Sequence, residues 1–133
     1  MDNTHNIYLI SDSTGETIDR IFMAIKAQFI NFNYQVFQFS FTRTETQIKT
    51  ILNKAKKDPK PIILYTVVNS RLEQYLLNES KIRGIPCFGV LGDLISNFSK
   101  IINEEATHKP SAQHVLDEEY YKRIEAIQFT MSH

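Results

Sequence analysis

Residues 7–18 read IYLISDSTGETI, an apolar run that leads into a hydroxyl-rich turn with a single glycine. The apolar run, residues 7–11, predicts a strand. The apolar residues after Gly15 recur at the spacing of an amphipathic helix, at Ile18, Ile21, Phe22, Ile25 and Phe29. A strand, a polar turn and a helix in this order are typical of a phosphate-binding loop. The stretch therefore predicts both the first unit of the fold and a candidate site.

Strand and helix patterns alternate along the rest of the chain. Strands are predicted at residues 34–41, 62–68 and 85–91, the first of them near a sheet edge because phenylalanines alternate there with polar residues. Thr44 and Ser70 begin capping boxes that predict two helix starts, and Gly84 predicts the end of the second helix. The predicted fold class is α/β, a three-layer Rossmann-like open parallel sheet of about four strands with helices on both faces, plus a C-terminal helix.

Two more helices are predicted toward the end of the chain. One begins at Asp93 and would turn its apolar side chains inward, at Leu94, Ile95, Phe98, Ile101 and Ile102. Polar residues 103–113 predict a loop. The last helix is predicted from Asp117, with one apolar face at Tyr120, Ile124, Ile127 and Met131. We expect an α/β domain over residues 1–113, and over residues 114–133 a C-terminal helix that leads toward a domain absent from this chain.

Bulk composition narrows the functional classes. The 133 residues carry 15 acidic and 15 basic side chains, so no net field favours nucleic acid or an anionic membrane as a partner. No apolar run approaches the ~20 residues that cross a bilayer. The single cysteine, Cys87, favours a reducing, cytoplasmic location. The four histidines show no metal-ligand spacing with one another or with Cys87, so no metal site is predicted.

The turn after the first strand is the candidate binding site. Backbone N–H groups at a helix start attract anions. The hydroxyls of Ser13, Thr14 and Thr17 add donors, and Gly15 lets a ligand approach the backbone closely. These four residues are the predicted anion- or phosphate-binding residues; the alternative is that Ser13 or Thr14 merely caps the helix. Asp12 is expected to orient the turn, with coordination of a metal ion as the alternative.

Residues 14–17 read TGET, which resembles the T-G-x-T phosphate loop of flavodoxins. Flavodoxins also place aromatic residues beside the flavin in later loops. The corresponding loops here, residues 68–71 and 91–93, contain no aromatic residue, and the chain is neutral where flavodoxins are commonly acidic. A flavodoxin-like, FMN-binding electron carrier is therefore the alternative function.

A resemblance that covers nearly the whole chain rests on three motifs. They are SDSTGET with AQF at residues 11–17 and 27–29, RGIPC at residues 83–87, and a late group made of His114, LD at residues 116–117, Tyr120 and KRIEAIQF at residues 122–129. In order and spacing they resemble the bifunctional kinase/pyrophosphorylases that regulate pyruvate, phosphate dikinase and phosphoenolpyruvate synthase. Three ordered matches are more specific than the TGET signature alone.

The resemblance implies an activity. Proteins of this family are ADP-dependent Ser/Thr kinases that phosphorylate the dikinase or the synthase and so switch it off. They also remove that phosphate by attack of inorganic phosphate, which releases pyrophosphate. ADP, inorganic phosphate and a divalent metal ion are thus implied for the full-length proteins.

The family holds the diphosphate with a Gly-Ser-Arg-Lys-Thr type loop in its C-terminal half. None of the four glycines of this chain begins a G-K-[ST] sequence. We therefore expect an N-terminal half that carries no catalytic residue, binds no cofactor and is inactive alone. Its expected partners are the target enzyme and the missing C-terminal kinase domain, and a homodimer is a further expectation. A non-catalytic module that binds an anion or a partner is the remaining alternative.

Overall fold

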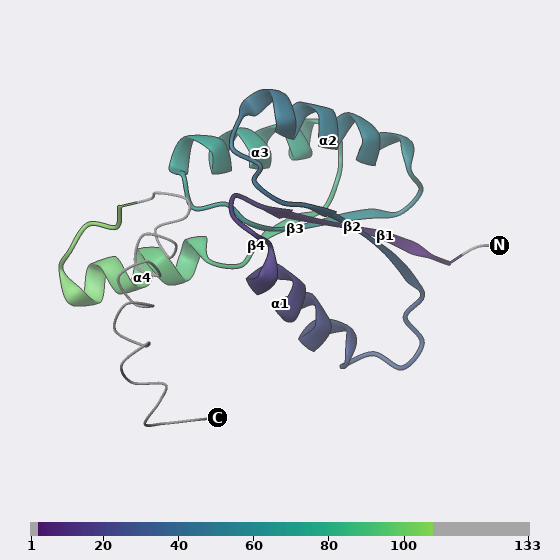
Figure 1. Cartoon of the computed structure of the whole chain (residues 1–133), viewed down its shortest axis with the longest axis horizontal. Helices are drawn as coiled ribbons and strands as arrows, with labels where there is room; N and C mark the ends of the chain where they lie inside the picture. Colours follow the sequence, from purple (N-terminus) through teal and green to yellow (C-terminus); the bar gives the residue numbers. More distant parts are fainter. Residues whose placement is uncertain (1–2, 108–133) are drawn as a thin grey trace, which may run out of the picture.

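A single four-stranded sheet forms the centre of the protein, in a computed structural model that describes residues 3–107 of the chain. Its strands are β1 (His5–Ser11), β2 (Tyr34–Phe39), β3 (Pro61–Thr66) and β4 (Cys87–Gly89). All neighbouring strands are parallel, and their order across the sheet is β2-β1-β3-β4 (Figure 1). The predicted open parallel sheet is confirmed.

Four helices are described, and the first three form a layer on each side of this sheet (Figure 1). They are α1 (Glu16–Lys26), α2 (Glu45–Lys57), α3 (Ser70–Ile82) and α4 (Gly92–Ile102). In Figure 1, α2 and α3 cover one face of the sheet and α1 lies against the opposite face, so the predicted three-layer arrangement is confirmed. None of the helices in residues 3–107 is long and apolar enough to cross a bilayer. The predicted C-terminal helix, in residues 114–133, lies outside the described residues.

Strand β1 supplies side chains to both cores of the domain. Tyr8 and Ile10 belong to a buried cluster with side chains of α2 and α3. Ile7 and Leu9 belong to a second buried cluster with side chains of α1. Successive side chains of a strand point to opposite faces. The uninterrupted apolar sequence of β1 is therefore explained by burial on both sides.

Strand β2 lies at one edge of the sheet, as its alternating pattern predicted. The rings of Phe37 and Phe39 stack on the ring of Tyr8, with centroids 5.2 and 5.9 Å away. The ammonium of Lys54, on α2, lies 4.5 Å from the centroid of the Phe37 ring. These contacts fasten the edge strand to the central strand and to the helix layer above it.

The helix starts follow local hydrogen-bond chemistry. Helix α2 begins with the predicted capping box, in which the side chains of Thr44 and Gln47 each accept from the backbone N–H of the other. The prediction for α3 was wrong by one residue, because the capping side chain is that of Asn69, which accepts from the N–H of Leu72 (3.0 Å). Asparagine is as good a cap as serine, and Ser70 is instead the first residue of the helix.

The predicted glycine at the end of α3 is confirmed. Gly84 has a φ of +68°, in the left-handed region that favours glycine. Its N–H donates to the carbonyl of Lys81 (3.1 Å), and the N–H of Ile85 donates to the carbonyl of Ser80 (2.9 Å). These two bonds are a Schellman motif, which satisfies carbonyls at the end of the helix.

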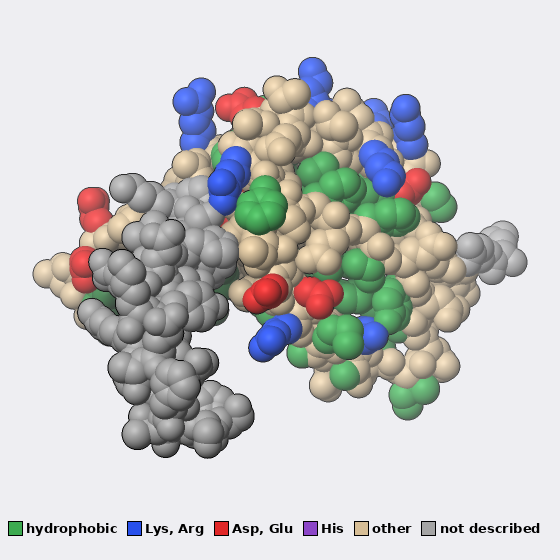
Figure 2. All heavy atoms as spheres, in the orientation of Figure 1, with side chains coloured by type: hydrophobic (Ala, Val, Ile, Leu, Met, Phe, Trp, Pro, Cys, Tyr) green, Lys and Arg blue, Asp and Glu red, His purple; other side chains and the backbone are tan. Residues whose placement is uncertain are grey.

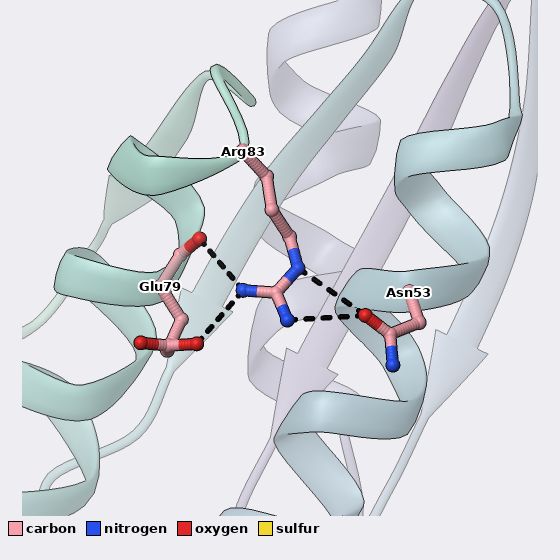
Figure 3. Close-up of polar contacts among 3 residues, drawn as sticks. All are labelled: Asn53, Glu79 and Arg83. Carbon is pink, nitrogen blue, oxygen red and sulfur yellow. Dashed lines mark hydrogen bonds and ion pairs between the residues drawn. The ribbon is translucent and has the colours of Figure 1, made fainter.

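Arg83 precedes that glycine and joins α3 to α2 (Figure 3). Its Nε and Nη2 donate to Oδ1 of Asn53 on α2, at 3.3 and 3.0 Å. Its Nη1 donates to the carbonyl oxygen (3.0 Å) and to Oε1 (2.9 Å) of Glu79 on α3. The arginine of the RGIPC motif therefore has a structural role at the junction of two helices.

The fourth strand and helix differ most from prediction. Strand β4 covers only Cys87–Gly89 rather than residues 85–91, because Ile85 still belongs to the cap of α3. Helix α4 buries none of its side chains. The side chains predicted to point inward include four that are between 54% and 79% exposed, at Leu94, Phe98, Ile101 and Ile102. In Figure 1, α4 extends away from the short edge strand, so the sheet does not cover its apolar face.

Candidate functional site

The predicted site, residues 11–17, lies at the carboxyl end of β1, between β2 and β3. The helix after β1 packs on one face of the sheet, whereas the helix after β3 packs on the other (Figure 1). The chain therefore changes direction between these two central strands. In open α/β sheets, ligands bind in the crevice at such a switch point.

The turn is held by its own hydroxyls and by the loop that follows β2. The Oγ of Ser11 accepts from the N–H of Ser13 at 3.0 Å, and the two Oγ atoms are 3.4 Å apart. The N–H groups of Phe41 and Thr42 donate to the carbonyls of Ser13 (2.9 Å) and Ser11 (2.8 Å). The turn therefore has a fixed backbone before any ligand arrives. Ser13 is buried within it, at 8% exposure.

Gly15 is required by its conformation and by a close neighbour. Its φ is +90°, and a Cβ added here would collide with the side-chain amide of Gln38 on β2. That amide donates to the Gly15 carbonyl (3.1 Å), and the Oγ of Ser40 donates to the Thr14 carbonyl (2.8 Å). The sequence predicted close approach by a ligand. In the structure the close approach at Gly15 is made by β2.

Helix α1 begins without a side-chain cap. Its N-cap residue is Gly15, which makes no side-chain cap hydrogen bond, so neither Ser13 nor Thr14 occupies the capping position that the alternative gave it. First-turn N–H groups without a side-chain cap keep their capacity to bind water or an anion. Thr17 is exposed in this first turn and Thr14 is half-buried. The structure therefore brings the four predicted residues together in one turn, and anion binding by them stays a prediction.

Charges of both signs surround this helix start. Glu16 and Asp19 lie in the first turn of α1, where they interact favourably with the helix dipole and reduce its attraction for another anion. The Nε of Arg43 donates to the carbonyl oxygen of Asp12 at 2.9 Å, which brings a guanidinium to the other side of the turn. An anion at this turn would therefore meet one cation as well as backbone donors.

Asp12 connects two loops at the switch point. Its carboxylate Oδ2 accepts from the N–H of Val68 (2.9 Å), in the loop after β3, and the residue is 3% exposed. Burial raises the pKa of the Asp12 carboxyl above its ordinary value, although the Val68 N–H and Arg43 act in the opposite direction. The side chain thus orients the turn, as the sequence predicted.

A contact between a buried tyrosine at the carboxyl end of β3 and a half-buried glutamate on α3 was not predicted. The hydroxyl of Tyr65 donates to Oε2 of Glu73 at 2.8 Å. Burial and the neighbouring carboxylate raise the pKa of the Tyr65 hydroxyl. A Cβ at Gly89 would lie 2.5 Å from the Tyr65 hydroxyl oxygen, and one at Gly92 would lie 2.6 Å from Oε2 of Glu73. Gly89 at the end of β4 and Gly92 at the start of α4 were the sequence signal for this close packing.

The described residues offer little for a metal or a diphosphate. Within residues 3–107, no three His, Cys, Asp or Glu side chains are grouped so that they could hold a metal ion. The whole sequence lacks a G-K-[ST] loop. The sequence therefore lacks the usual lysine loop for a nucleoside diphosphate, and residues 3–107 lack a metal-ligand group.

Comparison with known proteins gives one family and many relatives. The model of the Kinase/pyrophosphorylase family matches residues 7–133. A relative from Pelagibacter ubique is 60% identical over 133 residues, which are 100% of this chain and 48% of the relative. A relative from Geotalea daltonii is 36% identical over 125 residues, 94% of this chain and 46% of the relative. One from Lacticaseibacillus casei is 36% identical over 126 residues, 95% of this chain and 45% of the relative.

The names and lengths of these relatives agree with one another. Each of the three is named as a pyruvate, phosphate dikinase regulatory protein. The chain spans about half the length of the curated relatives it matches.

Proposed function

The chain belongs to the kinase/pyrophosphorylase family, and on that premise we propose that it is the N-terminal α/β domain of a protein that regulates pyruvate, phosphate dikinase. The proposal rests on 60% identity over all 133 residues to a relative whose name states that function. In the longer protein, an ADP-dependent Ser/Thr kinase activity phosphorylates the dikinase and switches it off. Phosphate-dependent removal of the phosphoryl group, with release of pyrophosphate, reverses the modification. The names of the relatives favour the dikinase over phosphoenolpyruvate synthase.

The phosphoryl transfer itself is assigned to the C-terminal half of the relatives, which the matched residues do not cover. Transfer from a nucleoside diphosphate needs a backbone cradle with a lysine, and a metal ion that neutralises the developing charge. The chain has no G-K-[ST] loop, and residues 3–107 offer no metal-ligand group. The domain contributes a binding surface for the dikinase and for its own kinase domain.

A phosphorylation assay tests this assignment. The 133-residue chain is incubated with purified dikinase and ADP, and phosphothreonine on the dikinase is measured by mass spectrometry. The full-length Pelagibacter ubique relative serves as the matched reaction. We expect modification with the relative and none with the chain. Modification by the chain alone would overturn the assignment to the missing half. Failure of the full-length relative to modify the dikinase would overturn the proposed function.

The turn at Ser13, Thr14, Gly15 and Thr17 is proposed to bind the phosphate group of a ligand of this regulator. Three observations support this: α1 starts without a side-chain cap, Thr17 is exposed in its first turn, and Arg43 lies beside the turn. Inorganic phosphate and the phosphates of ADP share the chemistry that this site would recognise.

Titration calorimetry with inorganic phosphate, and then with ADP, tests the turn. The variant Thr14→Ala with Thr17→Ala removes two hydroxyl donors, so affinity should fall at least ~tenfold. Thr46→Ala is the matched control, because Thr46 follows a glutamate in the first turn of α2 as Thr17 does in α1. That helix start is already satisfied by its capping box. Equal binding by the double variant and the control would refute the site.

A further inference from the structure

One face of the sheet is only partly covered in residues 3–107. Two helices, α2 and α3, cover one face, whereas α1 alone lies against the other (Figure 1). A groove of about 690 Å³ opens between α1 and strands β3 and β4 on this second face. Parallel sheets are normally buried on both faces. The groove is therefore the place where the fold lacks a covering element.

The groove is almost entirely apolar. It includes Phe29 and Phe88, which are 60% and 57% exposed, together with aliphatic side chains of α1 and β3. Figure 2 shows hydrophobic side chains at the surface around α1 and the loop after it. Among the described lining residues, Asn31 carries the only polar side chain. Small-molecule pockets usually contain several convergent polar groups, so an apolar protein segment suits this groove better than a small ligand.

The chain itself supplies such a segment after Thr107. Apolar residues recur at helical spacing at Tyr120, Ile124, Ile127 and Met131. Nine residues lie between Thr107 and Asp117, and an extended chain over these ten steps reaches ~33 Å. A domain of about 100 residues has a radius of gyration of only ~13 Å. Much of the surface around the end of the described chain is therefore within reach of this segment.

We propose that residues 117–131, which lie outside the described residues, form an amphipathic helix that fills the groove with the side chains of Tyr120, Ile124 and Ile127. A second copy of the chain is the competing occupant. The tether favours the segment of the same chain, because a short linker gives an effective concentration in the mM range. This inference does not depend on the proposed function, since it concerns only how the chain completes its own fold.

Hydrogen exchange in the 133-residue chain tests the proposal. Phe29→Asp places a charge in the groove, whereas Ile30→Asp changes the neighbouring residue, which is 99% exposed and outside the groove lining. We expect protected amides in residues 117–131 of the parent and of the Ile30→Asp control. Exchange there should accelerate at least ~tenfold in Phe29→Asp. Unprotected amides in the parent, or equal exchange in the two variants, would overturn the proposal.

Cross-linking covers the case in which Phe29→Asp fails to fold. In a Cys87→Ser background, Phe88→Cys is paired with Ile124→Cys and treated with a short bismaleimide. The control pair replaces Ile124→Cys by Lys122→Cys, which lies on the opposite side of the predicted helix. We expect a cross-link within one chain, with a yield several-fold above that of the control pair. Equal yields, no cross-link, or a cross-link between two chains would overturn the proposal, the last by identifying a second copy as the occupant.

Discussion

Alanine at Gly15 should destabilise the domain more than alanine at Gly84, and the difference should come from one hydrogen bond. Both glycines have positive φ, +90° and +68°, so a side chain at either costs about 1–2 kcal/mol of backbone strain. A Cβ at Gly84 meets nothing within 4 Å, whereas one at Gly15 displaces the amide of Gln38 from its 3.1 Å bond to the Gly15 carbonyl. That loss adds about 0.5–1 kcal/mol. We therefore expect ~1–2 kcal/mol for Gly84→Ala and ~1.5–3 kcal/mol for Gly15→Ala.

Urea unfolding followed by circular dichroism measures these differences, with a common slope for all variants. The decisive sample is Gly15→Ala combined with Gln38→Ala. With the Gln38 amide already removed, the glycine substitution should cost only the strain term, so the two changes should be less than additive by ~0.5–1 kcal/mol. Strict additivity, or a Gly15→Ala variant no less stable than Gly84→Ala, would refute this account of the turn.

Three other predictions concern single side chains. Arg83→Lys should lower the free energy of unfolding by about 1–2 kcal/mol, because lysine cannot reproduce the forked contacts. The control Arg71→Lys, at a side chain that is 88% exposed, should change the free energy of unfolding by less than ~0.5 kcal/mol. Equal effects of the two variants on the urea midpoint would contradict this prediction. Burial raises the pKa of the Cys87 thiol to about 11. The contribution of the neutral thiol to stability is therefore complete below pH 9 and is lost as the pH rises toward 11. Between pH 8.5 and 10.5 the free energy of unfolding should fall by roughly 1 kcal/mol in the parent, and this fall should be absent in Cys87→Ala. The raised pKa of Asp12 means that its ionised form is disfavoured in the folded state, so Asp12→Asn, which keeps an acceptor for the N–H of Val68, should be at least as stable as the parent at pH 7. Any gain in stability of the variant over the parent should shrink as the pH falls toward 4. A decrease of more than ~1 kcal/mol in the free energy of unfolding of the variant at pH 7 would show that the ionised carboxylate is stabilising.

The layered α/β fold could be predicted because its strands and helices carry long, unambiguous patterns. The uninterrupted apolar runs of β1 and β3 match burial on both faces, and the capping box at Thr44 starts a helix where predicted. Boundaries were less predictable, since neighbouring residues compete for one structural role. Asn69 takes the capping position expected of Ser70, and α1 ends at Lys26 although the apolar pattern continues to Phe29.

The site was predictable in position but not in its contacts. The sequence located the turn at the end of β1, because a glycine among hydroxyl residues follows an apolar run there. It could not show that Gln38 approaches Gly15, or that Asp12 binds the backbone of Val68, since these contacts join residues far apart in the chain. The outward-facing apolar side of α4 was also missed. Helical spacing identifies an apolar face, but it does not say what covers it.

The position of β1 in the sheet also affects the order of events during translation. Of the four described strands, the first to be synthesised is a central one, and its register pairs Ile7 with Val36 on one side and with Ile62 on the other. At a synthesis rate of ~5–20 residues per second, β1 waits several seconds for its second neighbour. During this interval a flat, apolar strand edge is unpaired and open to intermolecular pairing. Among the four strands of this sheet, β1 is therefore exposed for the longest time before both of its neighbours are present.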